Sequence, residues 1–370
     1  MKQTSKPWVK LPVLFLVIAI AAVLLTATMM VDSPTAQASD DTIQAPTPEP
    51  TLPSVIYIGA HASGSIDKKY NSTNTKVSFK RTDILRYIPG TGTWSIFKTK
   101  DDLGIPADVN LRDFEVLADG KILFVIDRTK TIAPLGKVTA RDVLRWSAGT
   151  LSFELQGINV GLTKSDENID ALAVTADDEL LISTNGNATY NTIPGKVPDE
   201  DLVKIVGNTA SLYFDGSAFK LTSSSEDVEA ASVDLTTGDK TLYLSTKDGF
   251  SATSSVNSVS GKDKDIFGVI PSAFNPITDG FLFQAFNGKA SGLKKEIDGI
   301  SVSFVPAASV AVSAALEDFS ENATLDEVDE GAAYDQAEYD EAMSQGDDQI
   351  TLEDFVEVVQ HVYLPVVAAR

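Results

Sequence analysis

The chain has 370 residues, 43% of them hydrophobic, and a formal net charge of −22 at pH 7. This length and composition are sufficient for one large hydrophobic core or two modest ones. The chain has no cysteine, which excludes disulfide bonds, thiolate metal sites and cysteine nucleophiles. The charge is concentrated in residues 311–370, which hold 16 acidic side chains and one basic side chain. Nucleic-acid binding is disfavoured, because it needs a basic face to neutralise phosphates.

The N-terminus has the composition of a secretory signal peptide. Three lysines within the first ten residues precede the uncharged apolar run Val13–Val31, and the small-residue triplet Ala36-Gln37-Ala38 follows. This order predicts a signal peptide over residues 1–38 with cleavage after Ala38. The alternative is a retained membrane anchor, because an apolar run of this length can span a bilayer. Both alternatives predict that the body is secreted or lies at the cell surface.

Residues 39–53 are rich in Pro and Thr, which predicts an extended linker. After this stretch, one sequence motif recurs four times. The motif is an acidic residue followed by alternating apolar residues, and its copies begin at Asp83, Asp142, Asp201 and Asp265. Their separations are 59, 59 and 64 residues. A nearly fixed period is typical of repeat proteins, in which one unit cannot bury its apolar face alone. The repeats occupy residues 54–306.

Each repeat contains four strand-like runs joined by turn signals. In the second unit they are 114–117, 122–127, 142–146 and 151–155. The third unit has 171–174, 180–184, 201–205 and 211–214, and the fourth has 231–234, 242–245, 265–269 and 281–284. Four antiparallel strands in each unit predict the blades of an all-β propeller.

The first unit lacks its first strand. It offers Ser54–His61, Asp83–Tyr87 and Trp94–Phe97, and a lone strand at Asp298–Phe304 follows the fourth unit. Together the two fragments make one blade, and sharing a blade between the chain ends removes free sheet edges. We therefore predict a four-bladed propeller over 54–306 whose shared blade has three N-terminal strands and one C-terminal strand. The alternative is an open sandwich or prism of the same strands.

The C-terminal stretch separates into two parts. Residues 307–350 are acidic and rich in alanine, which predicts a linker. Residues 351–370 begin with apolar side chains at helical spacing, which predicts a short helix that ends before Pro365.

The repeats resemble those of secreted bacterial proteins of unassigned function. The resemblance lies in the pattern D-[IVL]-L-x-[FYW], F-D-G-S, G-L and L-L-I-S, which is best kept in VGLTKSDENIDALAVTADDELLIST and SLYFDGSAFKL. It covers about residues 83–300. The ending HVYLPVVAAR is similar to a Y-L-P-V-V plus basic C-terminus of exported proteins, which implies sorting or envelope association. The resemblance implies no catalytic residues.

The chain is poor in the residues of nucleophilic catalysis. Its two histidines are His61, at the end of a predicted strand, and His361, on the predicted C-terminal helix. Neither a G-x-S-x-G elbow nor an H-E-x-x-H pair occurs. The residues therefore favour a function without catalysis.

Two sets of acidic residues recur at equivalent repeat positions. The repeat-start acids Asp83, Asp142, Asp201 and Asp265 could bind Ca²⁺, but loop caps through side-chain to backbone bonds are favoured. The acids on the innermost strands could converge at the channel as ligands of a divalent metal, with Ca²⁺ as the candidate cofactor. They are Asp113, Asp170, Glu229 and Asp298.

Long polar segments connect the second and third strands of each unit, at 62–82, 128–141, 185–200 and 247–264. Insertions at equivalent positions often project from one face of a repeat protein and bind partners there. Their aromatic residues are candidates for ligand contact. These are Tyr70, Tyr190 and Phe250.

The predicted function is an exported, non-enzymatic propeller that acts as a binding or cell-surface scaffold module. Its expected partner is an extracellular protein or polysaccharide. One alternative is a metal-dependent hydrolase or lactonase with carboxylates at the central channel. Another is an adhesin that binds polysaccharide.

Overall fold

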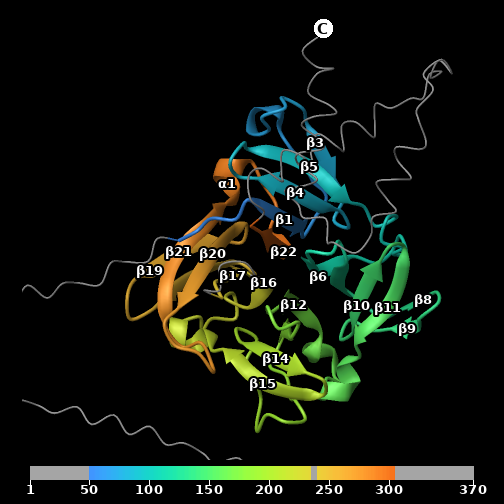
Figure 1. Ribbon diagram of the computed structural model, residues 1–370, viewed down its shortest axis with the longest axis vertical. Helices are drawn as coiled ribbons and strands as arrows, with labels where there is room; N and C mark the ends of the chain where they lie inside the picture. The colour runs from blue at the N-terminus through green and yellow to red at the C-terminus, as the bar shows by residue number, and fades with distance from the viewer. Residues whose placement is uncertain (1–49, 235–239, 305–370) are drawn as a thin grey trace, which may run out of the picture. The chain divides into compact units, whose positions relative to one another are not determined.

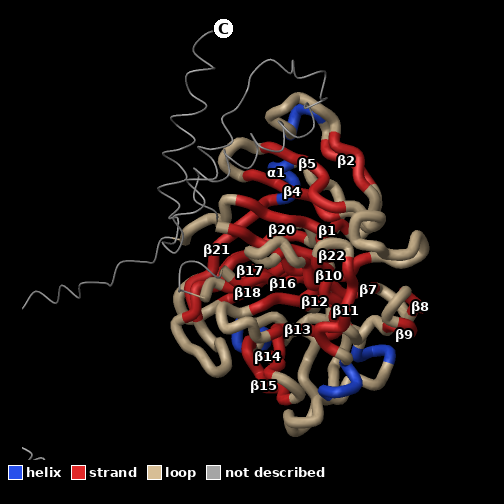
Figure 2. Tube along the Cα trace, turned by 45° about the vertical axis from the view of Figure 1, so that its right-hand side comes forward, coloured by secondary structure: helices blue, strands red, loops and turns tan. Residues whose placement is uncertain are grey.

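The computed structural model describes residues 50–234 and 240–304. Four antiparallel sheets of four strands surround a common axis in Figure 1, so the protein is a four-bladed β-propeller. The predicted signal peptide, most of the first linker and the predicted tail over 307–370 lie outside the described residues. Strands are the main regular secondary structure of the body (Figure 2). Within the described ranges, no helix combines the length and the apolar content needed for crossing a bilayer.

The blades are numbered in chain order, and the strands of each blade run from the innermost to the outermost. Blade 1 consists of β22 (Ile297–Ser303), β1 (Val55–Ala60), β4 (Ile84–Ile88) and β5 (Thr93–Lys98). Blade 2 consists of β6 (Leu111–Val116), β7 (Ile122–Ile126), β10 (Val143–Ser147) and β11 (Thr150–Leu155). Blade 3 consists of β12 (Ile169–Val174), β13 (Leu180–Thr184), β14 (Leu202–Val206) and β15 (Thr209–Phe214). Blade 4 consists of β16 (Val228–Val233), β17 (Leu242–Thr246), β20 (Asp265–Pro271) and β21 (Gly280–Asn287).

The shared blade is confirmed. Strand β22 pairs antiparallel with β1 and places Val302 opposite Ile56, and Figure 1 shows the two strands side by side. The ring is closed by hydrogen bonds between strands from opposite ends of the repeat body. The alternative of an open sandwich or prism is therefore wrong.

The hydrophobic core lies between the blades. It forms four clusters, and each cluster joins residues of two neighbouring blades. Blades 3 and 4, for example, meet through Phe214 and Leu244 among others. Because every blade is covered on both faces, the ring arrangement buries apolar surface that a single repeat would expose.

The long segments between second and third strands are folded, and each packs apolar residues against the ring. Three fold into hairpins, and the fourth has the isolated bridge Ala188↔Val197. The hairpins are β2 (Gly64–Ile66) with β3 (Val77–Phe79), β8 (Lys130–Ile132) with β9 (Gly136–Val138), and β18 (Gly249–Thr253) with β19 (Ser258–Lys262). Each contributes buried apolar residues to the cluster between its own blade and the preceding one. The insertions therefore cover the joints of the ring.

This packing decides the role of the aromatic ligand candidates. Tyr190 and Phe250 are 3% and 4% exposed and belong to the core clusters. Tyr70 follows Lys69 in η1 (Lys68–Tyr70), where it is half-buried against the cluster between blades 1 and 4. The expectation of ligand contact is wrong for Tyr190 and Phe250, because their rings fill the gap between two blades.

The repeat-start acids cap their own loops, as favoured from the sequence. In three repeats the carboxylate accepts the N–H of a glycine that opens a short helix: Asp142 with Gly157 of η2 (Gly157–Val160), Asp201 with Gly216 of η4 (Gly216–Phe219), and Asp265 with Gly288 of α1 (Gly288–Ser291). In the first repeat, Asp83 accepts the N–H of Lys80 at 2.8 Å. A further short helix, η3 (Ser165–Glu167), precedes β12. These aspartates fix the connections between strands and blades.

Candidate functional site

One carboxylate lies at the centre of the ring. Oδ1 of Asp113 accepts the backbone N–H groups of Phe114 at 2.7 Å and Ile300 at 3.0 Å. Oδ2 accepts those of Leu172 at 2.6 Å and Ala231 at 3.1 Å. Because these four residues occupy the same register position on β6, β22, β12 and β16, each blade donates one bond. Asp113 thereby joins all four blades.

Small residues make room for this side chain. The positions equivalent to Asp113 on the other inner strands are Ala171, Ala230 and Gly299. A Cβ added to Gly299 would lie 2.9 Å from Oδ1 of Asp113. Burial raises the pKa of Asp113, while the four N–H donors lower it. With all its acceptor positions directed at backbone N–H groups, Asp113 is a structural residue and not a metal ligand.

A second polar layer fills the channel next to Asp113. The hydroxyls of Ser301 and Ser232 donate to Glu115, at 2.5 Å to Oε1 and 3.0 Å to Oε2 respectively. The same hydroxyls accept the N–H groups of Val116 and Val302. Glu115 is buried, and burial raises its pKa. Together the two layers occupy the channel axis with bonded side chains.

The mouth of the channel is the end at which the inner strands begin. Here Arg112, Asp170, Glu229 and Asp298 occupy equivalent positions, two residues before the residues that donate to Asp113. The sequence repeats predicted Asp113 at this level, and that alignment was wrong by one residue. The registers of the inner strands shift next to these positions, as between Leu111 and Phe114, so counting along the sequence does not locate the inward side. The mouth therefore carries three acids and one arginine.

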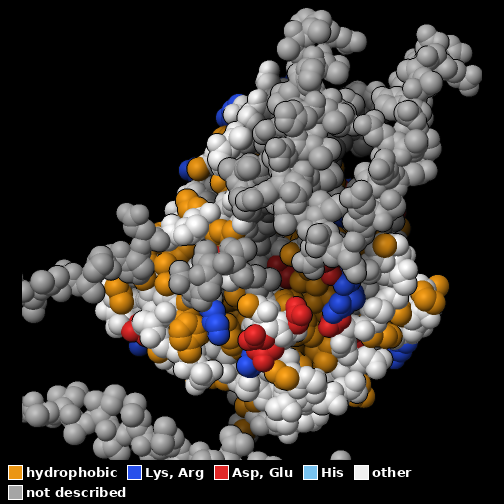
Figure 3. All heavy atoms as spheres, viewed as in Figure 1, with side chains coloured by type: hydrophobic (Ala, Val, Ile, Leu, Met, Phe, Trp, Pro, Cys, Tyr) orange, Lys and Arg blue, Asp and Glu red, His pale blue; other side chains and the backbone are white. Residues whose placement is uncertain are grey.

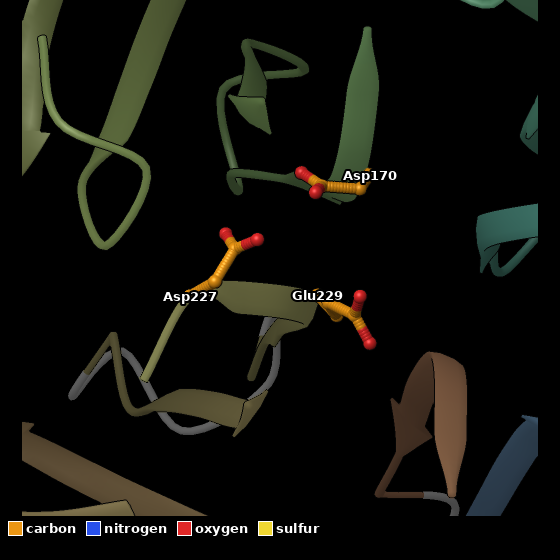
Figure 4. A group of neighbouring side chains, drawn as sticks. All are labelled: Asp170, Asp227 and Glu229. Carbon is orange, nitrogen blue, oxygen red and sulfur yellow. The ribbon is translucent and has the colours of Figure 1, made fainter. Parts of the chain in front are cut away.

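Three buried carboxylates meet on one side of the mouth. Asp170, at the start of β12, lies near Glu229 on β16 and Asp227 just before it, and oxygens of all three lie within 4.8 Å of one another. Their exposed fractions are 1%, 6% and 2% respectively. Figure 4 shows Asp170 and Asp227 directed toward each other, while the end of Glu229 is turned away from Asp227. We call these three residues the mouth triad.

Most of the triad's oxygens lack hydrogen-bond partners. Both oxygens of Asp170, Oδ1 of Asp227 and Oε2 of Glu229 are buried without one. The nearby Arg112 also has a buried Nε without a partner. Buried polar groups are nearly always paired in folded proteins, so this site calls for an additional partner.

The carboxyl groups of the triad raise one another's pKa values, which favours their protonated, neutral forms. Burial, together with the carboxylates of Asp199 and Glu229, raises the pKa of Asp227 to about 8. Burial also raises the pKa of Asp170, and the Asp227 carboxylate raises it further. Arg112 opposes these shifts by its positive charge.

The other acids of the mouth also affect the pKa values of the triad. Burial, together with Asp298 and Glu296, raises the pKa of Glu229 to about 7. Asp298 differs from the triad because both its oxygens are bonded, Oδ1 to Nδ1 of His61 at 2.7 Å and Oδ2 to a guanidinium nitrogen of Arg81 at 3.1 Å. Of the four acids predicted as metal ligands, the structure thus brings together Asp170 and Glu229.

Asp227 was missed from the sequence because it lies just outside its strand. The equivalent residues before the other inner strands are Asn110, Asn168 and Glu296, so the position is polar in every blade. This alternation of polar residues, two apart at the start of each inner strand, is the signal that could have found it.

On the face drawn in Figure 3, acidic side chains lie close to Lys and Arg side chains around hydrophobic ones. Ion pairs on the strands include Lys204 of β14 with Glu179, which precedes β13, and Arg145 of β10 with Glu154 of β11. A cavity of about 170 Å³ lies between blades 3 and 4 at the end opposite the mouth and is lined by Tyr213 and Phe274 among others.

Neither a family model nor a curated protein matches the chain. Solved structures with similarity include a streptogramin B lyase, with 10% identity, a TM-score of 0.27, and coverage of 62% of this chain and 70% of that chain. A luciferin-regenerating enzyme has 9% identity and a TM-score of 0.27, with coverage of 60% and 77%. The major allergen Mala s 1 of Malassezia sympodialis has 9% identity and a TM-score of 0.29, with coverage of 65% and 84%. Scores this low transfer no function to this chain.

Proposed function

We propose that the protein is an exported, non-enzymatic binding module that takes a basic group of an extracellular partner protein at the mouth of its channel. The observation that carries the proposal is the excess of acidic side chains there. The acids that act on one another are Asp170, Asp199, Asp227, Glu229, Glu296 and Asp298. The basic groups that act on them are Arg81, Arg112, Lys247 and, when protonated, His61.

Burial affects the charge of the mouth. The mouth triad is shielded from water, so any charge that its carboxyl groups carry is screened less than a charge on an open surface. A basic ligand nearby would favour the ionised form of these groups. Export is supported by the signal-peptide pattern of residues 1–38.

The filled axis confines such a ligand to the mouth. Beyond the triad level, Asp113 is bonded to all four blades and Glu115 to two serine hydroxyls. A side chain that binds at the mouth cannot pass between these layers without breaking their hydrogen bonds. This shallow geometry suits recognition of an exposed basic residue on a partner surface.

The proposal is tested by surface plasmon resonance with an immobilised oligo-lysine peptide at low and high salt. The mouth variant combines Asp199→Asn with Glu296→Gln, and the matched control combines Asp177→Asn with Asp178→Asn on the exposed turn at the opposite end. Both variants retain the acidic segment 311–370, so its contribution to binding cancels. We expect weaker binding, with a smaller salt dependence, for the mouth variant alone.

Equal binding by the two variants would contradict the proposal. Binding to a glycan array that is unaffected by the mouth variant would instead support the polysaccharide-binding adhesin.

A second candidate, metal-dependent hydrolysis of an ester or lactone, is favoured by one specific observation. Asp298 holds Nδ1 of His61, and the His61 side chain is 46% exposed beside the mouth. A histidine oriented in this way can act as a general base. Turnover of an aryl ester or lactone that requires Ca²⁺ and is lost in His61→Asn would establish this function in place of the first.

A further inference from the structure

We propose that the mouth triad of Asp170, Asp227 and Glu229 binds a divalent cation, and that Ca²⁺ is the ion that its ligands fit. The three carboxylates supply all the side-chain ligands of this site, and the site does not depend on a basic partner above them.

The spacing of the triad is that of ligands around one ion. Each residue has a carboxylate oxygen within 4.8 Å of an oxygen from the other two. Two oxygens that bind one Ca²⁺ at about 2.3–2.6 Å each can lie up to about 5 Å apart on opposite sides of the ion. Three oxygens that are at most 4.8 Å apart lie at most about 2.8 Å from a common centre, so an ion there needs only a small inward movement of the side chains to reach Ca²⁺ bonding distance.

Two blades bring these ligands together. Asp227 and Glu229 flank Val228, whose side chain packs in the core, so the two acids lie on the other side of the chain. Asp170 begins the inner strand of the neighbouring blade and points at Asp227 (Figure 4). The site thus depends on the joint between blades 3 and 4.

The unpaired oxygens of Asp170 point to a partner from outside the polypeptide. Asp170 is 1% exposed, and neither of its oxygens accepts a hydrogen bond. Asp113 is buried to the same degree on the neighbouring inner strand, yet it accepts four N–H bonds. The fold can therefore satisfy a buried carboxylate completely, and at Asp170 it leaves both oxygens available.

The groups that face the triad do not supply this partner. Arg112 and Lys247 act on it by charge without a hydrogen bond to Asp170, and Tyr190 lies near Asp170 with its hydroxyl bonded to Thr184. Asp199, Glu296 and Asp298 add negative charge. A cation can bind oxygens of several carboxylates at once and neutralise their negative charge, whereas another hydrogen-bond acceptor could not pair with them.

The ligand chemistry selects the ion. The triad offers carboxylate oxygens and neither sulfur nor imidazole, which excludes a preference for soft or borderline metals. Ca²⁺ accepts six to eight oxygens in flexible geometry, whereas Mg²⁺ requires a near-ideal octahedron at about 2.0–2.1 Å. Three acids from two different blades, completed by water or backbone carbonyls, suit the more tolerant ion.

The test uses the full chain, freed of metal with EDTA and then dialysed, and measures Ca²⁺ and Mg²⁺ binding by calorimetry and thermal unfolding. The variants are Asp170→Asn and Asp227→Asn, with Asp178→Asn on an exposed turn as the matched control. All four proteins keep the acidic C-terminal segment, so any Ca²⁺ that this segment binds contributes equally to each measurement. The triad site is the component present in wild type and control and lost in the two variants.

We expect Ca²⁺ to raise the melting temperature of wild type and control, and Mg²⁺ to raise it less. Each triad variant should bind Ca²⁺ more weakly by a larger factor than the about 10- to 100-fold that follows loss of an outer-shell partner. In the absence of metal, Asp170→Asn should melt no lower than wild type, because it replaces a buried carboxyl group that has no hydrogen-bond partner. An Asp170→Asn protein that keeps the Ca²⁺ shift, or a wild type that shows none at millimolar Ca²⁺, would overturn the proposal.

Discussion

Replacing Asp113 with asparagine tests whether one carboxylate holds the four blades together. The amide keeps one oxygen, which can still accept two of the four N–H groups from Phe114, Leu172, Ala231 and Ile300. Its NH₂ group then faces the other two N–H donors. Each buried donor left without an acceptor costs about 1–3 kcal/mol, so Asp113→Asn should lower the free energy of unfolding by about 2–6 kcal/mol.

Glu115→Gln is the matched control in the adjacent layer. Its partners are the hydroxyls of Ser232 and Ser301, which can rotate to accept as well as donate. Burial raises the pKa of Glu115, which favours the neutral acid that glutamine resembles. This substitution should change the free energy of unfolding by less than about 1 kcal/mol.

Urea unfolding at pH 7, followed by circular dichroism and tryptophan fluorescence, measures both variants on the same scale. We expect these two isosteric changes to lower the free energy of unfolding by very different amounts, although the two acids are buried and lie only two residues apart on β6. An Asp113→Asn protein that unfolds at the wild-type urea concentration would refute this expectation, and would show that backbone donors at the axis find other acceptors.

Three further predictions concern the mouth, the crossovers and ring closure. In EDTA, stability should fall as pH rises from about 4 to about 8. The folded-state pKa values of Asp227 and Glu229, about 8 and about 7, lie above their unfolded values, so the folded protein retains protons that the unfolded chain has released. A melting temperature that stays constant between pH 5 and 9 would contradict this. Gly216→Ala places a Cβ 2.4 Å from the Glu200 carbonyl oxygen, and chemical unfolding should show a loss above about 1 kcal/mol, whereas Gly90→Ala, with open space around it, should show almost none. A chain ending at residue 296 lacks β22 and should fail to give the folded monomer that a chain ending at residue 304 gives in size-exclusion chromatography; equal behaviour would mean that the ring need not close.

The architecture could be predicted because it is written in repeated local patterns. The motif copies that begin at Asp142 and Asp201 have the same spacing, alternation and cap, and a missing first strand at one end matches a surplus strand at the other. Each of these signals depends on residues close together in the sequence or on a comparison of repeats. The strand pairing of β1 with β22 then follows, since an unpaired sheet edge is unfavourable.

The candidate site was harder to predict because it depends on register and on contacts between blades. Asp113 lies one residue further along its strand than Asp170 does, because Arg112 holds the position equivalent to Asp170. Asp227 was missed because it precedes its strand, and the hairpin residue Phe250 was misread because its partner, Phe267, lies on another strand of the blade. Each error concerns side-chain direction or long-range packing.

Asp113 has a structural role, whereas Asp170 is a candidate ligand. Both carboxylates are buried on inner strands, and burying an ionised carboxylate without compensation is strongly unfavourable. At Asp113 the small residues Ala171, Ala230 and Gly299 let four backbone N–H groups provide the compensation. At the mouth, the equivalent positions of the inner strands hold Asp170, Glu229 and Asp298 instead of small residues. Acidic groups therefore face one another there, and no backbone N–H group donates to Asp170. A propeller that needed only stability could place apolar side chains at the mouth, and the buried carboxyl oxygens without partners there are the reason that we propose a cation as their ligand.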